Sequence, residues 1–79
     1  MARVLLFGAL SDLAGWREKT LAAVSISDLR QRLGADDATL GEALAGPGVQ
    51  VALDQILVRH DAVLTAASEV AFLPPMSGG

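Results

Sequence analysis

The C-terminal end of the chain carries the group whose position points most clearly to a chemistry. The last four residues are Met76-Ser77-Gly78-Gly79, so the terminal carboxylate stands on two residues without side chains. Such a carboxylate is ionised at neutral pH, with an ordinary pKa of about 3.3–3.7, and it is a poor electrophile. It becomes reactive only if a separate enzyme activates it, for example as an acyl-adenylate, which a sulfur or nitrogen nucleophile then attacks.

Two terminal glycines suit a tail that must enter another protein. Glycine has no Cβ, so Gly78-Gly79 can pass through a channel only as wide as a backbone. The four residues 76–79 reach at most about 13–14 Å when extended, which is enough to enter a partner's active site. A Gly-Gly end taken alone is more often a frayed terminus. The segment before it decides between these interpretations.

That segment, residues 69–75, predicts a buried strand followed by a stiff lead. Glu69-Val70-Ala71-Phe72-Leu73 is apolar, branched and aromatic, which favours a strand. Pro74 ends the strand because proline lacks a backbone donor, and the Pro74-Pro75 pair favours extended polyproline geometry. We therefore expect a domain over residues 1–75 and a flexible tail over residues 76–79. The residues expected to thread a partner's site are Pro74, Pro75, Met76, Ser77 and Gly78, with Gly79 as the reacting end.

Other side chains offer little chemistry. His60 is the only histidine, and His60-Asp61 could form an acid–base pair, although an exposed histidine in a connecting loop is the favoured interpretation. No His, Asp or Glu pair has metal-ligand spacing, so we expect no metal and no cofactor bound by this chain. Trp16 could anchor a partner, but covering a small core is favoured.

Composition excludes several function classes. A chain of 79 residues predicts one domain with a small core. The net charge of −3 and six scattered Lys and Arg residues argue against nucleic-acid binding. Without cysteine, the chain cannot form disulfides or carry sulfur on a side chain. It has no apolar run of membrane-spanning length and no signal peptide, so we expect a cytoplasmic protein without membrane contact. A hydrophobic content of 52% predicts apolar surface left over for a protein partner.

Strand-like and helix-like segments alternate along the chain without repeats or linkers. We expect strands at residues 2–7, 19–24, 49–53, 56–58 and 69–73, and helical segments at residues 10–14 and 25–33. A further helical segment, capped by Asp36 or Asp37, is expected to carry Leu40, Ala43 and Leu44. Ser25 with Asp28 three residues later predicts a capping box at the start of the main helix, and Gly34 is expected to end it. Gly46-Pro47-Gly48 breaks the last helical segment, and Asp54-Gln55 joins two strands in a tight turn.

The order of these elements suggests an α+β fold. If the first and last strands lie side by side and parallel, the main helix supplies the crossover that parallel neighbours require. This arrangement is the β-grasp of ubiquitin-like proteins, a mixed sheet with the first and last strands at its centre.

The C-terminal sequence Glu-Val-Ala-Phe-Leu-Pro-Pro-Met-Ser-Gly-Gly resembles the ending of the small subunit of molybdopterin synthase. Residues 4–15, Val-Leu-Leu-Phe-Gly-Ala-Leu-Ser-Asp-Leu-Ala-Gly, resemble the first strand and helix of that family. Residues 51–58, Val-Ala-Leu-Asp-Gln-Ile-Leu-Val, resemble its central hairpin. The resemblance therefore covers essentially the whole chain.

This resemblance implies a ubiquitin-like β-grasp protein that carries sulfur. An activating enzyme would use ATP to adenylate Gly79, which is then converted to a thiocarboxylate. The tail would enter the large synthase subunit and donate sulfur to a cyclic pyranopterin phosphate, forming the dithiolene that later holds molybdenum or tungsten. The family forms a heterotetramer with two copies of each subunit, and its small subunit catalyses nothing by itself.

The resemblance also identifies candidate contacts. Leu57 and Leu73 occupy positions where the family presents an apolar sheet face to its activating enzyme and large subunit. Phe72 and Phe7 are further candidates for partner contacts. Each could equally belong to the core, because neighbouring residues on a strand point to opposite faces. Ser11 stands where the family commonly has Arg, and Asp54 where it has Asn, so contacts with the activating enzyme are expected to differ.

Three alternatives remain open from the sequence. A similar carrier ending in Gly-Gly serves thiamin thiazole synthesis, although Phe-Leu-Pro-Pro before the tail fits the molybdopterin carrier better. The chain could instead be a ubiquitin-like modifier that forms isopeptide bonds with lysines. It could also be a binding module whose terminal glycines are incidental.

Overall fold

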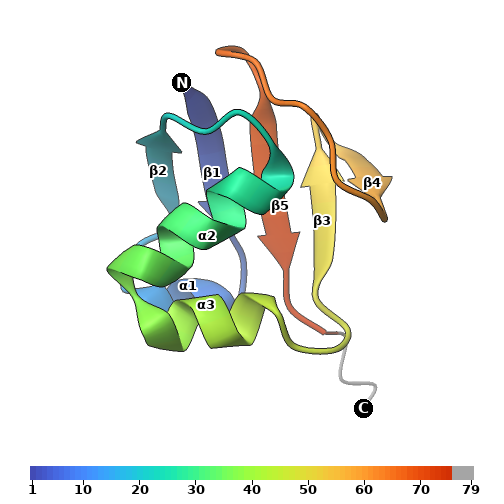
Figure 1. The fold of residues 1–79 in the computed structure, drawn as a ribbon. Helices are drawn as coiled ribbons and strands as arrows, with labels where there is room; N and C mark the ends of the chain where they lie inside the picture. Colours follow the sequence, from blue (N-terminus) through green and yellow to red (C-terminus); the bar gives the residue numbers. More distant parts are fainter. Residues whose placement is uncertain (76–79) are drawn as a thin grey trace.

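The computed structural model describes residues 1–75, which form a five-stranded mixed sheet with three helices (Figure 1). The strand order is β2-β1-β5-β3-β4. The strands are β1 (Ala2–Leu6), β2 (Glu18–Leu21), β3 (Gln50–Leu53), β4 (Ile56–Val58) and β5 (Glu69–Leu73). β1 and β5 are parallel neighbours inside the sheet, and the other neighbouring strands are antiparallel. This topology confirms the predicted β-grasp.

The central pair of strands divides its side chains between two faces. Val4 pairs with Val70 and Leu6 with Phe72, and all four side chains are buried in the core. The intervening pair, Leu5 and Ala71, lies outside the core cluster. Since successive side chains alternate across a strand, these two residues belong to the opposite face of the sheet.

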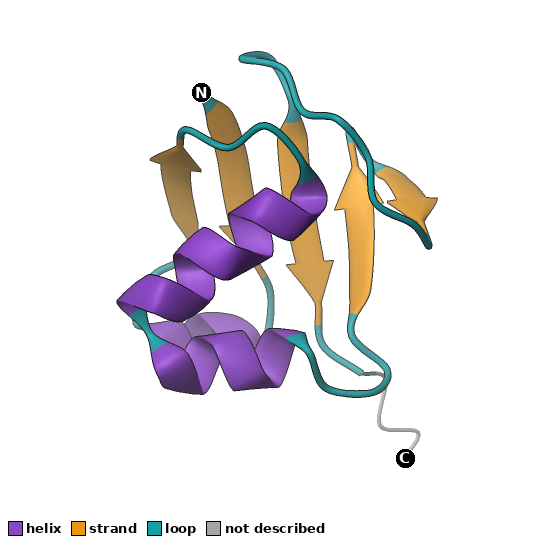
Figure 2. Cartoon of the chain, in the orientation of Figure 1, coloured by secondary structure: helices purple, strands orange, loops and turns teal. Residues whose placement is uncertain are grey.

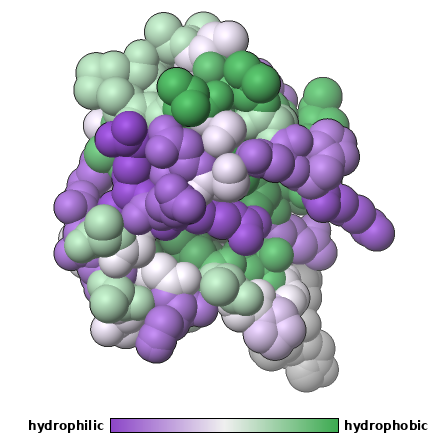
Figure 3. All heavy atoms as spheres, viewed as in Figure 1, coloured by the Kyte–Doolittle hydropathy of each residue, from purple (hydrophilic) through white to green (hydrophobic). Residues whose placement is uncertain are grey.

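The helices cover one face and one end of the sheet (Figure 2). They are α1 (Ala9–Ala14), α2 (Ile26–Asp36) and α3 (Ala38–Leu44). α2 crosses the face of the sheet, while α1 and α3 lie at the end where β5 finishes. Hydrophilic side chains gather on the outer side of α2 (Figure 3). Its inner side contributes Ile26, Leu29 and Leu33 to the core.

The predicted cap of the main helix is present. The backbone N–H of Asp28 donates to the Ser25 hydroxyl at 3.0 Å. The Asp28 carboxylate accepts the backbone N–H of Val24 at 3.0 Å and lies 3.1 Å from the Arg32 guanidinium. These hydrogen bonds hold the pKa of Asp28 below its usual value, chiefly through the Val24 N–H and then through Arg32. The bond to Ser25 satisfies a donor that the first helical turn leaves unpaired, and the bond from Val24 fastens the residue before the cap to the helix.

The predicted end of this helix at Gly34 is wrong. α2 continues through Gly34 to Asp36, and α3 begins directly after Asp37, whose carboxylate accepts the N–H of Leu40 at 3.2 Å. Gly34 faces Gly41 of α3, and a Cβ placed on Gly41 would lie 2.7 Å from the Gly34 Cα. The glycines therefore allow the two helices to pack backbone against backbone. From the local sequence alone, a glycine with this role looks the same as a glycine that ends a helix.

The β3–β4 hairpin has the predicted tight turn. Asp54 and Gln55 both have positive φ, 50° and 71°, as a type I′ turn requires at its two central residues. The Asp54 carboxylate accepts the Glu69 N–H at 2.9 Å, and the Asp54 N–H donates to the Glu69 carbonyl at 2.8 Å. These bonds fix the hairpin to the start of β5.

The core is built from apolar side chains of the sheet and helices. It consists of Ala2, Val4, Leu6, Leu10, Ile26, Leu29, Leu33, Leu40, Leu44, Val51, Leu64, Val70 and Phe72. Trp16 packs on its edge, and the Lys19 ammonium lies 4.7 Å from the centre of the Trp16 ring. Trp16 therefore covers the core, as its sequence context favours.

Candidate functional site: the open sheet face and the tail exit

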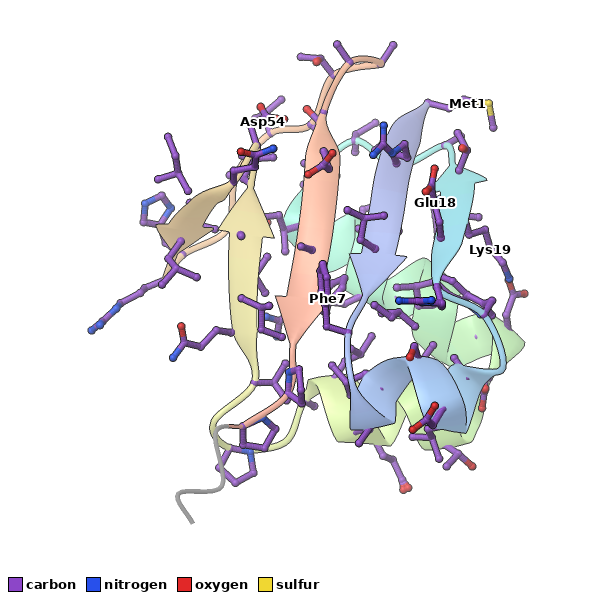
Figure 4. All side chains as sticks on the ribbon, turned by 180° about the vertical axis from the view of Figure 1, so that it is seen from behind. Met1, Phe7, Glu18, Lys19 and Asp54 are labelled. Carbon is purple, nitrogen blue, oxygen red and sulfur yellow. The ribbon has the colours of Figure 1, made fainter. Side chains whose placement is uncertain are left out.

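One face of the sheet carries no helix within residues 1–75 (Figure 4). The strand register places four apolar residues side by side across this face. Leu5 of β1 pairs with Ala71 of β5, Ala71 pairs with Ala52 of β3, and Ala52 pairs with Leu57 of β4. We call this row, together with Phe7 and Leu73, the open apolar face.

Phe7 and Leu73 extend the row toward the end of β5. Phe7 is 44% exposed and its backbone N–H donates to the Phe72 carbonyl at 3.3 Å. Figure 4 shows the Phe7 side chain on this face, between β1 and β5. Leu73 is half-buried and Leu57 is 56% exposed. Large apolar side chains exposed on one face indicate a protein contact surface.

The opposite end of this face is charged. The Arg3 guanidinium lies 3.1 Å from the Glu18 carboxylate and 3.1 Å from the Glu69 carboxylate. Arg3 and Glu69 are register partners at the end where β5 begins. The sheet face therefore changes from ion pairs at the start of β5 to apolar side chains at its end, where the tail leaves.

The tail exit is formed by Pro74 and Pro75, directly after β5. A Cβ placed on Gly8 would lie 3.1 Å from the Pro74 Cγ, and one on Gly48 would lie 2.7 Å from the Pro75 Cβ. Both prolines thus lie close against the body of the domain, one at the start of α1 and one in the loop before β3. Met76, Ser77, Gly78 and Gly79 lie outside the described residues, so the roles predicted for them stay predictions.

The structure corrects the prediction of Phe72 as a partner contact. Phe72 is 0% exposed and belongs to the core. It pairs with Leu6 and Val51, whose side chains also point toward the helices. The pleat of the strand explains the difference, because Phe72 and its neighbour Leu73 must point to opposite faces. Of the four candidate contacts, Leu57, Leu73 and Phe7 therefore share the open apolar face.

His60 and Asp61 do not form an acid–base pair. The His60 Nδ1 atom lies 2.8 Å from the backbone carbonyl of Asp61. The Asp61 carboxylate accepts three hydrogen bonds: from the Ser27 N–H at 2.9 Å, from the Ser27 hydroxyl at 2.8 Å, and from the N–H of the next residue, Ala62, at 2.9 Å. These hydrogen bonds hold the pKa of Asp61 below its usual value, and the bond from the Ser27 N–H has the largest effect. Asp61 fastens a loop to the first turn of α2.

Within the described residues, no group of three or more His, Cys, Asp or Glu side chains is arranged to hold a metal ion. None of the helices in residues 1–75 has the length and apolar character needed to cross a membrane. The part of the site that the structure describes consists of the open apolar face and the segment Pro74-Pro75 that follows β5.

Sequence reasoning missed part of this site. Leu5, Ala52 and Ala71 follow from the strand register, and the alternation of strand side chains could have suggested them. The sequence does not indicate that Gly8 and Gly48 contact the prolines after β5. Gly48 is part of a helix-breaking segment, and Gly8 is part of a stretch that resembles the family's first strand and helix. Their role depends on contacts with residues distant in the sequence.

Comparison with known proteins agrees with these features. Residues 4–79 match the ThiS family. The chain is 36% identical to the molybdopterin synthase sulfur carrier subunit of Escherichia coli strain K12, over an alignment of 81 positions that covers 100% of both proteins.

Two solved structures share the fold. The small archaeal modifier protein 1 of Methanosarcina acetivorans matches with a TM-score of 0.87 and 22% identity, over 99% of this chain and 95% of that one. The protein of the same name from Haloferax volcanii matches with a TM-score of 0.80 and 22% identity, over 99% and 98% of the two chains. These likenesses bear on the fold alone. The match over nearly the whole length, with a relative named as a sulfur carrier, shows that this chain belongs to the ThiS family of ubiquitin-like sulfur carriers.

Proposed function

We propose that this chain is the sulfur carrier subunit of a molybdopterin synthase, with Gly79 as the carrier of the sulfur atom. The observation that carries the proposal is the full-length similarity, at 36% identity, to a relative with that name. The ending Phe-Leu-Pro-Pro-Met-Ser-Gly-Gly, on a strand that finishes beside an open apolar face, supports it.

The proposed chemistry has two stages. In the first, an activating enzyme joins the Gly79 carboxylate to the α-phosphate of ATP and releases pyrophosphate. Sulfur at the oxidation level of hydrosulfide then attacks the acyl carbon, AMP leaves, and the terminus becomes a thiocarboxylate. A sulfur donor is required because the chain has no cysteine of its own.

In the second stage, the thiocarboxylate sulfur forms a carbon–sulfur bond with a carbon of a cyclic pyranopterin phosphate held by the large synthase subunit. The carbon–oxygen bond at that carbon breaks, and its oxygen leaves as water or stays on the phosphate. Water then cleaves the bond between the acyl carbon and that sulfur, which restores the Gly79 carboxylate. Each tail carries one sulfur, and a dithiolene contains two, so each product requires two deliveries. In this reaction the chain supplies docking surface and a sulfur atom, while the large subunit supplies the catalytic groups.

The open apolar face is the proposed docking surface. Leu57, Leu73 and Phe7 are exposed or half-buried there, and Leu73 directly precedes the tail exit. A partner that covers this face therefore receives the tail at its own edge. The same face would serve the activating enzyme, because both reactions use the same terminus.

The first stage is tested with the pure chain, its cognate activating enzyme, ATP and a sulfur donor. We expect the intact mass to show one oxygen replaced by one sulfur, and fragmentation to place the change at Gly79. Chains with Gly79→Ala, or with one residue added after Gly79, are the controls and should transfer no sulfur while remaining folded. Full molybdopterin synthesis by either control would contradict the role of the tail.

The second stage separates this proposal from its alternatives. The thiocarboxylated chain is mixed with the large subunit and cyclic pyranopterin phosphate, and in a parallel reaction with the enzymes of thiazole synthesis. Formation of the dithiolene in the first reaction supports the proposal, and sulfur transfer only in the second supports a thiamin carrier. Adducts of higher mass on lysines would instead identify a modifier.

A further inference from the structure

The two strands beside β5 each bring a glycine to the end where the tail leaves. β1 is parallel to β5, so Gly8, which follows β1, lies at that end. β3 is antiparallel to β5, so Gly48, which precedes β3, lies there too. Both glycines have positive φ, 56° and 85°.

Gly48 is in the tighter contact. A Cβ on Gly48 would lie 2.7 Å from the Pro75 Cβ, 3.5 Å from its Cα and 3.7 Å from its Cγ. These atoms belong to a ring fused to the backbone, so no side-chain rotation can relieve the clash. Pro75 is exposed and comes after the last strand, whereas Gly48 lies in a loop between α3 and β3. The residue that moves most easily is therefore Pro75.

Gly8 makes a milder contact with the preceding residue. A Cβ there would lie 3.1 Å from the Pro74 Cγ and 3.9 Å from its Cδ. The Gly8 carbonyl accepts the Ser11 N–H at 3.1 Å and the Ser11 hydroxyl at 2.9 Å. Because these bonds anchor Gly8 to α1, it offers a fixed surface to Pro74.

We propose that Gly8 and Gly48 are positioning residues that set the direction in which the tail leaves the domain. By omitting their side chains, they let the two stiff prolines pack against the loops on either side of β5. This inference rests on the proposed function, since the direction matters only if the tail must enter a partner's site. The competing explanation is that each glycine serves only the backbone conformation of its own loop.

Gly15 provides a matched control for that explanation. It has φ of 83°, close to the 85° of Gly48, and a Cβ there would meet nothing within 4 Å. Gly15→Ala and Gly48→Ala both place an alanine at positive φ, which strains the backbone in each case, but only Gly48→Ala displaces Pro75. Denaturant unfolding measures the stability that each variant loses and verifies that both are folded under the conditions of the transfer assay.

The decisive measurement is single-turnover sulfur transfer from the thiocarboxylated chain at saturating large subunit, together with the Kd of the complex. Misplacement of a reacting group by about 1 Å can reduce a rate by roughly 100-fold. We expect Gly48→Ala to reduce the transfer rate on the order of 10- to 100-fold relative to Gly15→Ala. The Kd should differ little between the two, because the open apolar face is unchanged. Equal transfer rates for the two variants would overturn the proposal.

A double-mutant cycle with Pro75→Gly tests the contact itself. Glycine at position 75 removes the ring, so Gly48→Ala should have a much smaller effect in that background than in the unmodified chain. Additive effects would show that Gly48 acts through something other than Pro75.

A readout independent of sulfur transfer keeps this inference separate from the proposed function. NMR of the unmodified chain should show contacts between the Gly48 α-protons and the Pro75 ring, and Gly48→Ala should abolish them. Absence of these contacts in the unmodified chain overturns the positioning role, even if sulfur transfer occurs. If the contacts are present but the unmodified chain transfers no sulfur, the proposed function fails, and with it the role of the glycines in delivery.

Discussion

The crossing of α2 and α3 predicts opposite outcomes for the same substitution at two facing glycines. A Cβ on Gly34 would lie 3.5 Å from the Gly41 Cα, which is an ordinary van der Waals distance. A Cβ on Gly41 would lie 2.7 Å from the Gly34 Cα, which is too close, and the obstacle is backbone. Gly34→Ala should therefore be tolerated, whereas Gly41→Ala should force the helices apart.

The magnitudes follow from two opposing effects. Alanine in place of glycine inside a helix is favourable by about 0.5–1 kcal/mol. Gly34→Ala should gain up to that amount. Gly41→Ala gains the same but suffers an overpacking cost of about 1–3 kcal/mol. The free energies of unfolding of the two variants should then differ by about 1–3 kcal/mol, with Gly41→Ala the less stable.

The measurement is urea unfolding followed by circular dichroism, with thermal unfolding as a second readout. For a domain of this size, 1 kcal/mol corresponds to about 4–8 °C in Tm. We therefore expect the Tm values of the two variants to differ by at least about 4 °C. The slopes of the urea transitions should be equal, because both variants expose the same surface on unfolding. Equal stabilities, or a more stable Gly41→Ala, would refute the close packing of the two helix backbones.

Three further predictions concern the sheet and its loop. Phe72→Ala should lower the free energy of unfolding, measured by urea unfolding, by about 3–5 kcal/mol. Phe7→Ala should alter this free energy much less and should instead weaken binding to the large subunit. The reverse pattern would contradict the assignment of the two side chains to opposite faces of the sheet. Leu57→Asp should raise the Kd for the large subunit at least about tenfold, as substitution of an interface hot-spot residue does. The Tm of this variant should stay close to that of the unmodified chain. An unchanged Kd would exclude Leu57 from the interface. The fold lowers the pKa of Asp61, so the ionised carboxylate contributes its full stabilisation at pH values well above the ordinary pKa of 3.8, and this contribution is lost as the pH falls below 3.8. The stability advantage of the unmodified chain over Asp61→Asn should therefore shrink in acid. An advantage that grows in acid would contradict the contacts of Asp61 with Ser27.

The elements and their order could be predicted because their signals are local. Strand β5 matches the predicted residues because its branched and aromatic residues end at Pro74. The Ser25 cap and the Asp54-Gln55 turn follow from hydrogen bonds and dihedral angles within a few residues. The β-grasp topology then followed from the need of parallel strands for a crossover helix, together with the family resemblance.

The errors and omissions arose where distant residues meet. Gly34 carries the sequence signal of a helix end, and only its contact with Gly41 shows why the helix continues. Phe72 and Leu73 are both apolar, and the strand register decides which of them reaches the core. The contact of Gly48 with Pro75 joins residues that are far apart in the chain. Such contacts depend on tertiary packing, which the sequence pattern does not specify.

The arrangement of the described surface bears on how one carrier could serve two partners. Under the proposed function, activation and transfer both use the single tail and the apolar face beside it, so the two partners must bind in turn. The carrier must therefore leave the first partner before it meets the second. The centre of the open apolar face is formed by Ala71 and Ala52, with Leu5 and Leu57 at the ends of the row. Ala71 and Ala52 are each only 8% exposed, so the centre of the face offers little accessible apolar area, unlike the large apolar cores of permanent interfaces. This composition favours a complex that can dissociate, as repeated delivery of sulfur requires.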